Sequence, residues 1–406
     1  MNDWCELVQG GVTAPKGFRA GTARCGIRQA AGDDVGLLVG PAGGSAAAVF
    51  TTNRVVAAPV TWSRATMARG AVCAAVVNAG NANACTGERG LRDVEATAAA
   101  AAEALGLGPE NLLVASTGII GRFLPVEKLL AGVGEAARGL DDSLEAGDAF
   151  ARAIMTTDTV PKQVALRCDL GEGSVTLGGT TKGAGMIAPG MATTLTFLTT
   201  DARIERPVLL EMLRRAIEVT YNRISIDNHM STNDTAVCLA SGLAEAPAIA
   251  AGSEGAVRFE AALTELCGRL ARMIVADGEG ATRLVTIEVV GAPSEESAVR
   301  VGRAIADSPL CKCALHSGDP NWGRFVSAAG FACAELEEAK TSLHIGGKLA
   351  YAAGGPADTP LPDLEAAMAG DEVTLRLDLG LGAGEATVWT CDLSREYVTI
   401  NADYHT

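Results

Sequence analysis

The sequence predicts a layered α/β fold, with α+β character, in which strands and helices are mixed along the whole chain. Strand-like runs rich in Val, Ile and Thr alternate with amphipathic or alanine-rich helical segments throughout the 406 residues. Nearly half of the residues (48%) are apolar but only 4% are aromatic, so the core must be built from small aliphatic side chains. This length is enough for one large domain or two of ordinary size.

The first half of the chain shows both kinds of element. Strands are expected at 47–53, 71–78, 111–116 and 174–178. The alanine-rich segment 91–105 predicts a helix that ends at Gly106, and a second helix begins at Pro125. The stretch TKGAGMIAPGMATTL (181–195) holds too many glycines and prolines for a regular element. It is therefore expected to be a loop, with its glycines providing slack.

The second half alternates in the same way. Helices are expected at 207–220, where Leu210, Leu213 and Ile217 share one face, and at 257–275. Strands are expected at 194–202, 284–290, 372–379 and 386–393. The tail YVTINADYHT (397–406) alternates similarly and is also expected to be a strand.

Charge and composition exclude several classes of function. A formal net charge of −15 argues against nucleic-acid binding, which needs a basic surface. No run of about 18 apolar residues predicts a membrane span, and the acidic N-terminus is unlike a secretory signal. The expectation is a soluble, cytoplasmic protein that binds neither nucleic acid nor membrane.

The 11 cysteines are an odd number scattered along the chain, which indicates reduced thiols rather than a disulfide framework. Their closest grouping is Cys311 and Cys313, with His316 just beyond. One such pair lacks the second matching pair that structural zinc sites use, so no metal site is expected.

Ordinary nucleophile motifs are missing from the sequence. There is no G-x-S-x-G elbow, and the spacing of the histidines favours no catalytic triad. A threonine at a chain terminus offers another route, because its own α-amine can serve as the base. That requires a cut before the threonine. The pair Ala192-Thr193, a small residue followed by a hydroxyl at the end of a strained loop, meets the requirement.

The loop TKGAGMIAPGMATTL resembles the cleavage loop of the ornithine acetyltransferase family, the bifunctional glutamate N-acetyltransferases of arginine biosynthesis. Further segments look like the same family, in its order and over nearly the whole chain. They are VVNAGNANACTGERGLRDVEAT (76–97), VASTGIIGR (114–122), AIMTTDTVPK (153–162), ADGEGATR (276–283), GDPNWGR (318–324) and YVTINADYHT (397–406). The family usually carries Asn where this chain has Gly190.

The resemblance implies a set of roles. Thr193 matches the nucleophile that self-cleavage at Ala192-Thr193 exposes, leaving an α chain (1–192) and a β chain (193–406). Thr117 and Gly118 match the pair that stabilises the oxyanion. The substrate-contacting positions are Thr156, Lys182, Thr193, Glu279, Asn401 and Thr406. Lys182 suits the α-carboxylate of N-acetylornithine, and Glu279 suits its side-chain ammonium.

The implied reaction moves an acetyl group from N-acetylornithine to glutamate through acetyl-Thr193. It needs no cofactor, although acetyl-CoA is a possible second acetyl donor. The family also implies a heterotetramer of two α and two β chains. Two alternatives stay open: an N-terminal-nucleophile amidohydrolase or aminopeptidase on the same scaffold, and an uncleaved binding protein.

Overall fold

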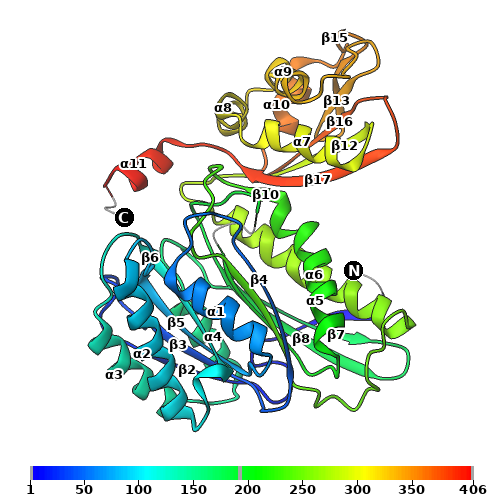
Figure 1. The fold of residues 1–406 in the computed structure, drawn as a ribbon. Helices are drawn as coiled ribbons and strands as arrows, with labels where there is room; N and C mark the ends of the chain where they lie inside the picture. The colour runs from blue at the N-terminus through cyan, green and yellow to red at the C-terminus, as the bar shows by residue number, and fades with distance from the viewer. Residues whose placement is uncertain (1–2, 191–193, 404–406) are drawn as a thin grey trace.

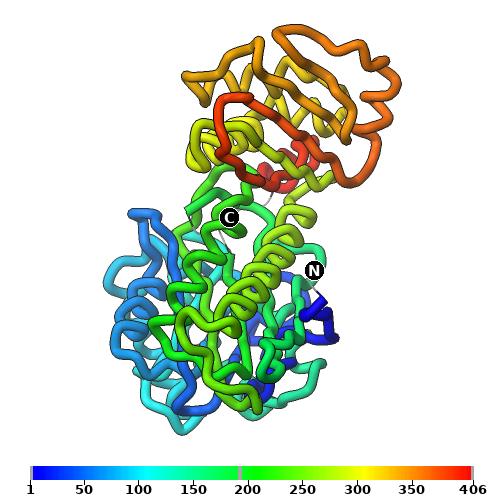
Figure 2. Tube along the Cα trace, turned by 90° about the vertical axis from the view of Figure 1, so that its right-hand side faces the viewer, coloured from blue at the N-terminus to red at the C-terminus, as the bar shows by residue number. Residues whose placement is uncertain are grey.

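The computed structural model describes residues 3–190 and 194–403, and it confirms the mixed α/β fold. Two lobes lie one above the other in Figures 1 and 2, a larger lower lobe and a smaller upper lobe formed by the C-terminal third of the chain. Among the described residues, no helix is both long enough and apolar enough to span a bilayer.

The lower lobe contains a six-stranded sheet that brings distant segments together. Its strands, in spatial order, are β1 (Cys5–Val8), β7 (Lys162–Asp169), β8 (Ser174–Lys182), β9 (Leu195–Thr200), β11 (Thr235–Ala240) and β4 (Ser45–Phe50). Every residue of β9 and β11 is buried, because both faces of the sheet are covered. Helices α5 (Arg206–Glu218) and α6 (Glu254–Ala276) cover one face.

A four-stranded sheet packs against the other face. Its order is β2 (Arg19–Ala23), β3 (Val35–Val39), β5 (Ala74–Asn81) and β6 (Leu112–Ile119). A shared apolar core joins the two sheets, with Leu38 and Val77 on one side and Phe197 and Val237 on the other. The outer helices are α1 (Ala58–Arg69), α2 (Gly87–Leu105) and α3 (Val126–Arg138). Helix α2 contains the whole of the helix predicted at 91–105. Helix α4 (Leu144–Ala153) and the short η1 (Pro109–Asn111) complete this part.

The upper lobe is built on a seven-stranded sheet. Its order is β10 (Ile224–Ser225), β17 (Gly384–Cys391), β12 (Leu284–Ala292), β16 (Glu372–Asp378), β13 (Ser342–Ile345), β14 (Lys348–Ala352) and β15 (Gly355–Pro356). Its helices are α7 (Glu295–Ala306), α8 (Pro309–Ser317), α9 (Trp322–Ala332) and α10 (Leu361–Ala367). The short η2 (Tyr221–Arg223) precedes β10.

The C-terminal tail differs from its prediction. Residues 397–406 were expected to form a strand, but Arg395–Asp403 form helix α11, which lies between the lobes in Figure 1. Ser394 Oγ accepts a 3.1 Å hydrogen bond from the N–H of Glu396, an arrangement that starts a helix. Val398 is 62% exposed, so the alternating apolar residues are not facing a sheet.

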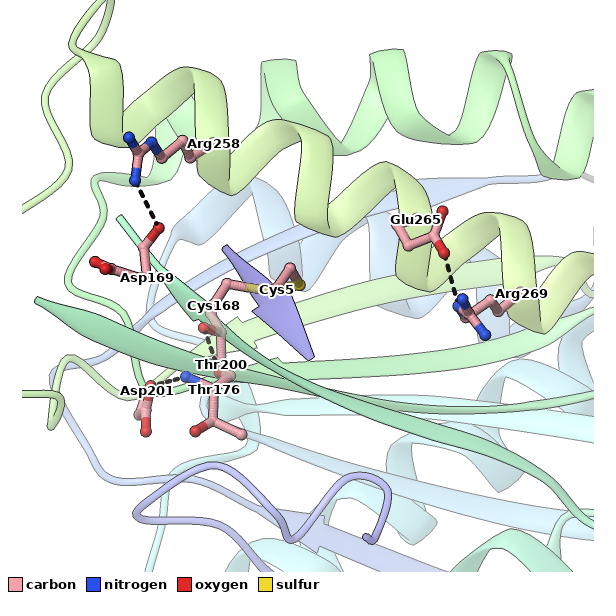
Figure 3. The surroundings of a disulfide bond; sticks show 9 residues. All are labelled: Cys5, Cys168, Asp169, Thr176, Thr200, Asp201, Arg258, Glu265 and Arg269. Carbon is pink, nitrogen blue, oxygen red and sulfur yellow. Dashed lines mark hydrogen bonds and ion pairs between the residues drawn. A yellow bond between two sulfur atoms is a disulfide. The ribbon is translucent and has the colours of Figure 1, made fainter. Parts of the chain in front are cut away.

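The expectation that all cysteines are reduced is wrong at one pair. Cys5 and Cys168 form a disulfide, leaving nine of the 11 cysteines free. The two residues stand opposite each other on the antiparallel strands β1 and β7, with their Cα atoms 4.2 Å apart. Figure 3 shows the bridge in the sheet beneath helix α6. The sequence could not indicate the bridge, because 163 residues separate its two ends.

Candidate active site

The predicted cleavage loop connects two neighbouring antiparallel strands. β8 ends at Lys182 and β9 begins at Leu195, and these two residues are paired in the sheet. Ala192 and Thr193, the predicted cleavage site and nucleophile, lie outside the described residues, as does Thr406. The residues on either side of 191–193, Gly190 and Thr194, are both described.

Hydrogen bonds hold the described part of the loop in place. The N–H of Gly183 donates to Asp158 Oδ1 (2.7 Å), and the carbonyl of Ala184 accepts from the N–H of Glu279 (2.7 Å). Asp227 accepts from the N–H groups of Met186 (2.6 Å) and Ile187 (2.9 Å). The prediction of a slack loop is therefore wrong up to Gly190, since buried or half-buried acceptors capture its backbone N–H groups.

Gly190, the position where the family usually carries Asn, has a positive φ of +110°. Its N–H donates to Asn222 Oδ1 (3.2 Å), and its carbonyl accepts from the N–H of Thr52 (3.2 Å). A Cβ at this position would lie 2.5 Å from Met230 Cε. Glycine thus fits this position, because hydrogen bonds fix both its N–H and its carbonyl in a conformation that other residues rarely adopt.

The predicted oxyanion pair lies at the end of β6. Thr117 is buried, and Gly118 has a φ of +126°. A Cβ on Gly118 would lie 2.4 Å from the carbonyl carbon of Gly80 and 2.6 Å from the backbone N of Asn81, on the neighbouring strand. Only glycine can follow Thr117 here, because backbone atoms cannot move aside as a side chain can.

Lys182 reaches Thr117 across the interface of the two sheets. Its Nζ donates a 3.1 Å hydrogen bond to Thr117 Oγ1, and the side chain is only 4% exposed. Burial lowers the pKa of Lys182 from its usual value, and Lys162 adds to this, while Asp158, Glu279 and Asp234 oppose it. Burial thus favours the neutral amine of Lys182, and the acidic neighbours favour its cation.

A buried ion network, which the sequence did not predict, supports the start of the loop. Lys162 is fully buried and pairs with Asp158 (2.6 Å) and with Asp277 (2.5 Å). Burial would raise the pKa of Asp158, but Lys182, Lys162 and hydrogen bonds outweigh it and hold that pKa at about 2. Asp158 Oδ2 also accepts from the N–H of Thr156 (3.0 Å), so the network reaches another predicted site residue.

A cavity of about 500 Å³ lies beside this network. It is lined in part by Arg28, Arg152, Met155, Thr156 and Asp158. A space of this size is within the range of small-molecule sites, and Thr156 is part of its wall.

Glu279 and Asn401 approach the loop from the other side. The Glu279 carboxylate lies over Gly185, where a Cβ would be 2.4 Å from its Oε2. Asn401, on helix α11, donates a 2.8 Å hydrogen bond to the same Oε2. Tyr397 of this helix donates to Asp227 (3.3 Å), the residue that also holds Met186 and Ile187. The described part of the tail therefore bonds to residues beside the loop, and it does so as a helix and not as the expected strand.

Asp234 anchors the chain just after the predicted nucleophile. Its Oδ1 accepts from the N–H of Thr194 (2.9 Å), and the carboxyl group is buried. Burial raises the pKa of Asp234 well above its usual value, although the Thr194 N–H, Thr51 and Lys182 act in the opposite direction. Asp234 lies in the segment STNDT (231–235), which the sequence analysis did not single out.

The cysteine pair considered for a metal has other partners. Cys311 is buried and donates to the carbonyl of Arg324, whereas Cys313 is exposed. The Nδ1 atom of His316 lies 2.7 Å from Asp392 Oδ2. Within 3–190 and 194–403, no group of three or more His, Cys, Asp or Glu side chains is placed to hold a metal ion.

The predicted site residues that the structure describes are thus brought together around the loop. Thr117 and Lys182 are in contact, Thr156 joins them through Asp158, and Glu279 and Asn401 are bonded to each other. The residues that sequence reasoning missed are Asp158, Lys162, Asp277, Asp227 and Asp234. Asp158 and Lys162 lie in the segment AIMTTDTVPK, and Asp277 lies in ADGEGATR. Membership of these two family-like segments was the only indication in the sequence that these three residues belong to the site.

Comparisons with known proteins agree with the resemblance seen in the sequence. Residues 19–406 match the model of the ArgJ family. A Thermobifida fusca protein is 46% identical over 402 residues, and one from Symbiobacterium thermophilum is 44% identical over 403 residues. These matches cover 97% and 99% of this chain, respectively, and 100% of each relative. Both relatives are named arginine biosynthesis bifunctional protein ArgJ.

Among solved structures, an ornithine acetyltransferase complexed with ornithine from Mycobacterium tuberculosis is 43% identical. It covers 47% of this chain and 100% of its own, with a TM-score of 0.43. The match over residues 19–406, with relatives above 40% identity along their full lengths, shows that the chain belongs to the ArgJ family.

Proposed function

We propose that this protein transfers the acetyl group of N2-acetylornithine to glutamate in arginine biosynthesis, giving ornithine and N-acetylglutamate. Thr193 is the nucleophile, and the chain generates it by cutting itself between Ala192 and Thr193. Family membership supports this function, because the relatives are named bifunctional proteins of arginine biosynthesis. Acetyl-CoA is a possible second acetyl donor, and the reaction uses no cofactor.

The chemistry follows a ping-pong course. The free α-amine of Thr193 takes the proton of its own hydroxyl, and the oxygen attacks the acetyl carbonyl. When the C–N bond breaks, ornithine leaves with that proton on its amine, and the acetyl group remains on Thr193 as an ester. The amine of glutamate then attacks the ester and the C–O bond to Thr193 breaks. The proton that the glutamate amine loses passes through the α-amine of Thr193 to its oxygen, which releases N-acetylglutamate and restores the hydroxyl.

The oxyanion that forms in each step needs donors that are already in place. In this proposal they are the hydroxyl of Thr117 and the backbone N–H of Gly118. The backbone at Gly118 supports the assignment, since Gly118 is paired with Gly80 in the β5–β6 ladder and has a positive φ that other residues rarely adopt. A fixed donor stabilises developing charge without having to reorganise.

Substrate recognition uses charges of both signs. Lys182 would bind the α-carboxylate and Glu279 the side-chain ammonium, with Thr156, Asn401 and Thr406 completing the contacts and Thr193 itself holding the acetyl group. The observation that carries the proposal is the gathering of Thr117, Lys182, Glu279 and Asn401 around one loop that leads to Thr193. These four residues come from separate parts of the chain, and the fold brings them to the same loop.

The remaining features of the proposal come from the family and from composition. The mature protein is a heterotetramer of two α chains (1–192) and two β chains (193–406), and it works in the cytoplasm. With a net charge of −15, it has small-molecule substrates rather than nucleic acid or membrane as partners.

Incubation with N-acetylornithine, followed by intact-mass analysis, tests the function. The expected result is two chains of about residues 1–192 and 193–406, with an acetyl adduct on the second chain that glutamate removes. Thr193→Ala should remain one chain of 41.4 kDa, whereas Thr193→Ser should still be cleaved because serine keeps the hydroxyl. Acetate release that glutamate leaves unchanged would instead indicate an N-terminal-nucleophile amidohydrolase or aminopeptidase. A single uncleaved band for the wild type would indicate a binding protein.

A further inference from the structure

We propose that Lys182 is a positioning residue of the oxyanion site, which orients the hydroxyl of Thr117 so that its hydrogen points to the oxyanion. This role rests on the proposed function, because it requires Thr117 to stabilise an oxyanion. It differs from the substrate contact expected of Lys182, since it acts on the enzyme's own hydroxyl and does not depend on the substrate having a carboxylate.

The direction of the hydrogen bond is set by the chemistry of the two groups. The Lys182 ammonium has three hydrogens to donate and nothing to accept with, so Thr117 Oγ1 must be the acceptor in the 3.1 Å contact. A threonine hydroxyl has only one hydrogen, and it is then free to point elsewhere. Among the described residues, no acceptor takes this hydrogen.

The contact lies where solvent cannot compete. Lys182 is 4% exposed and Thr117 is 7% exposed, and the contact joins the end of β8 to the end of β6. In such surroundings a hydrogen bond from a charged donor is stronger than in water. The cation also polarises the Thr117 O–H bond, which makes the hydroxyl a better donor to a developing negative charge.

Neighbouring groups keep Lys182 in this position. Lys182 pairs with Leu195 in the sheet, so its backbone is fixed by the β8–β9 ladder. Asp158 and Glu279 lie close enough to favour the ammonium form, and Lys162 holds Asp158 through a 2.6 Å ion pair. Because an ammonium carries three hydrogens, Lys182 can bind Thr117 and still offer a hydrogen to a substrate carboxylate.

Two acetyl donors separate the two roles of Lys182. N-acetylputrescine is N2-acetylornithine without its α-carboxylate, so a residue that acts only on that carboxylate makes no difference to its rate of reaction. The measured quantity is the single-turnover rate constant for acetylation of Thr193, followed by intact mass. Lys182→Met should lower this constant by about 10²-fold on both substrates, in the range found when one oxyanion donor is lost.

The decisive number is the loss that Lys182→Met causes with N-acetylputrescine, because this substrate has no α-carboxylate for Lys182 to bind. Our proposal requires a loss of about 10²-fold there, and any additional loss with N2-acetylornithine reports the contact with its carboxylate. A Lys182→Met variant that slows only with N2-acetylornithine would overturn the proposal. Lys182→Arg keeps a cation at the end of β8 and gives the same test with N-acetylputrescine if the Met variant does not fold. Lys348→Met, an exposed lysine of the upper lobe, is the matched control.

A double-mutant cycle with Thr117→Val provides a second, independent test of the proposal. If Lys182 acts through the Thr117 hydroxyl, adding Lys182→Met to Thr117→Val should cost less than about twofold further with N-acetylputrescine. Losses that multiply would show that Lys182 acts independently of Thr117. Failure of the proposed function is distinguishable from both outcomes, because wild-type protein would then show no acetyl adduct with either substrate.

Discussion

The backbone N–H of Thr194 donates a 2.9 Å hydrogen bond to Oδ1 of Asp234, immediately after the proposed nucleophile. The other oxygen of this carboxyl group, Oδ2, is buried and has no hydrogen-bond partner among the described residues. Burial raises the pKa of Asp234 well above its usual value and so favours the neutral form of this carboxyl group. This buried carboxyl group holds the start of β9, close to where the proposed β chain would begin.

Replacement of Asp234 should separate hydrogen bonding from charge. Asp234→Asn keeps a carbonyl oxygen for the Thr194 N–H and should self-cleave at nearly the wild-type rate. Asp234→Ala leaves that buried N–H unpaired, which costs about 1–3 kcal/mol of stability, and should slow cleavage by about tenfold. The fraction of cleaved chain against time on a denaturing gel measures this.

The pH dependence of the same pair checks the protonation state. A raised carboxyl pKa means that the unfolded state releases the proton first, so Asp234 costs stability as pH rises above its ordinary pKa of 3.8. The Asn variant has no proton to lose and should therefore gain stability relative to wild type between pH 4 and pH 7. Equal gains at both pH values would show that Asp234 is ionised in the folded protein.

Gly118→Ala should abolish the oxyanion site while leaving most of the fold intact. The added Cβ would lie 2.4 Å from the backbone of Gly80, and φ is +126°, so the Thr117–Gly118 peptide must shift. We expect the acetylation rate to fall by about 10²–10³-fold. Gly43→Ala is the control, because Gly43 also has a positive φ (+90°) but no atom within 4 Å of the added Cβ. Equal activity in both variants would contradict the assignment of Gly118.

Lys162→Met should destabilise the protein far more than an equivalent change at the surface. It leaves Asp158 and Asp277 without the buried ammonium that pairs with both, a loss of about 3–5 kcal/mol. Lys340→Met breaks the exposed pair with Glu337, in which both side chains are about half exposed, and should cost about 0–1 kcal/mol. Urea unfolding at pH 7 measures both. A loss in Lys162→Met no larger than the control would show that the network is not formed.

The same network predicts how the wild type responds to acid. The pKa of Asp158 is held at about 2, below the ordinary 3.8, so its stabilising contribution is complete above pH 4. That contribution is lost as the pH falls from about 4 to 2, because Asp158 must then take up a proton. Unfolding curves at pH 5, 4, 3 and 2 would show it. Stability unchanged from pH 4 to 2 would contradict the low pKa.

Thiol titration in denaturant tests the Cys5–Cys168 bridge. Without reductant, nine of the 11 cysteines should react, and with reductant all 11. Cys5→Ser should give ten in either case, since Cys168 then has no partner. Eleven reactive thiols in unreduced wild type would show that the two cysteines are not bonded.

The sequence predicted where several helices and strands lie, but it did not predict the tertiary contacts that they make. The sequence pattern predicted helices α2, α3, α5 and α6 and strands β4, β5, β6, β8, β9, β12, β16 and β17, whereas the other elements were not predicted. The tail 397–406 alternates like a strand, yet its described part forms helix α11. Its helix depends on Ser394, which bonds both Glu396 N–H and the carbonyl of Gly280, far away in sequence. Alternation alone cannot report such a tertiary contact.

The motifs predicted which residues belong to the candidate site, but they did not predict the buried contacts between those residues. Thr117 and Lys182 were both named, but they are 65 residues apart and on different sheets, so their hydrogen bond was not predictable. Asp158 and Lys162 were within a quoted motif, yet nothing in the letters indicates that both are buried. Burial turns an ordinary acid and base into an ion pair that supports the site.

The order of the six-stranded sheet has a consequence for the maturation proposed for this protein. Strands β9 and β11, which follow residue 192, lie between β8 on one side and β4 on the other, both of which precede it. After a cut, each fragment lacks the neighbours that complete its backbone hydrogen bonds, so the pieces remain interlocked. Maturation is thus a one-way covalent change within a finished fold, and the two chains cannot be exchanged between molecules without unfolding both.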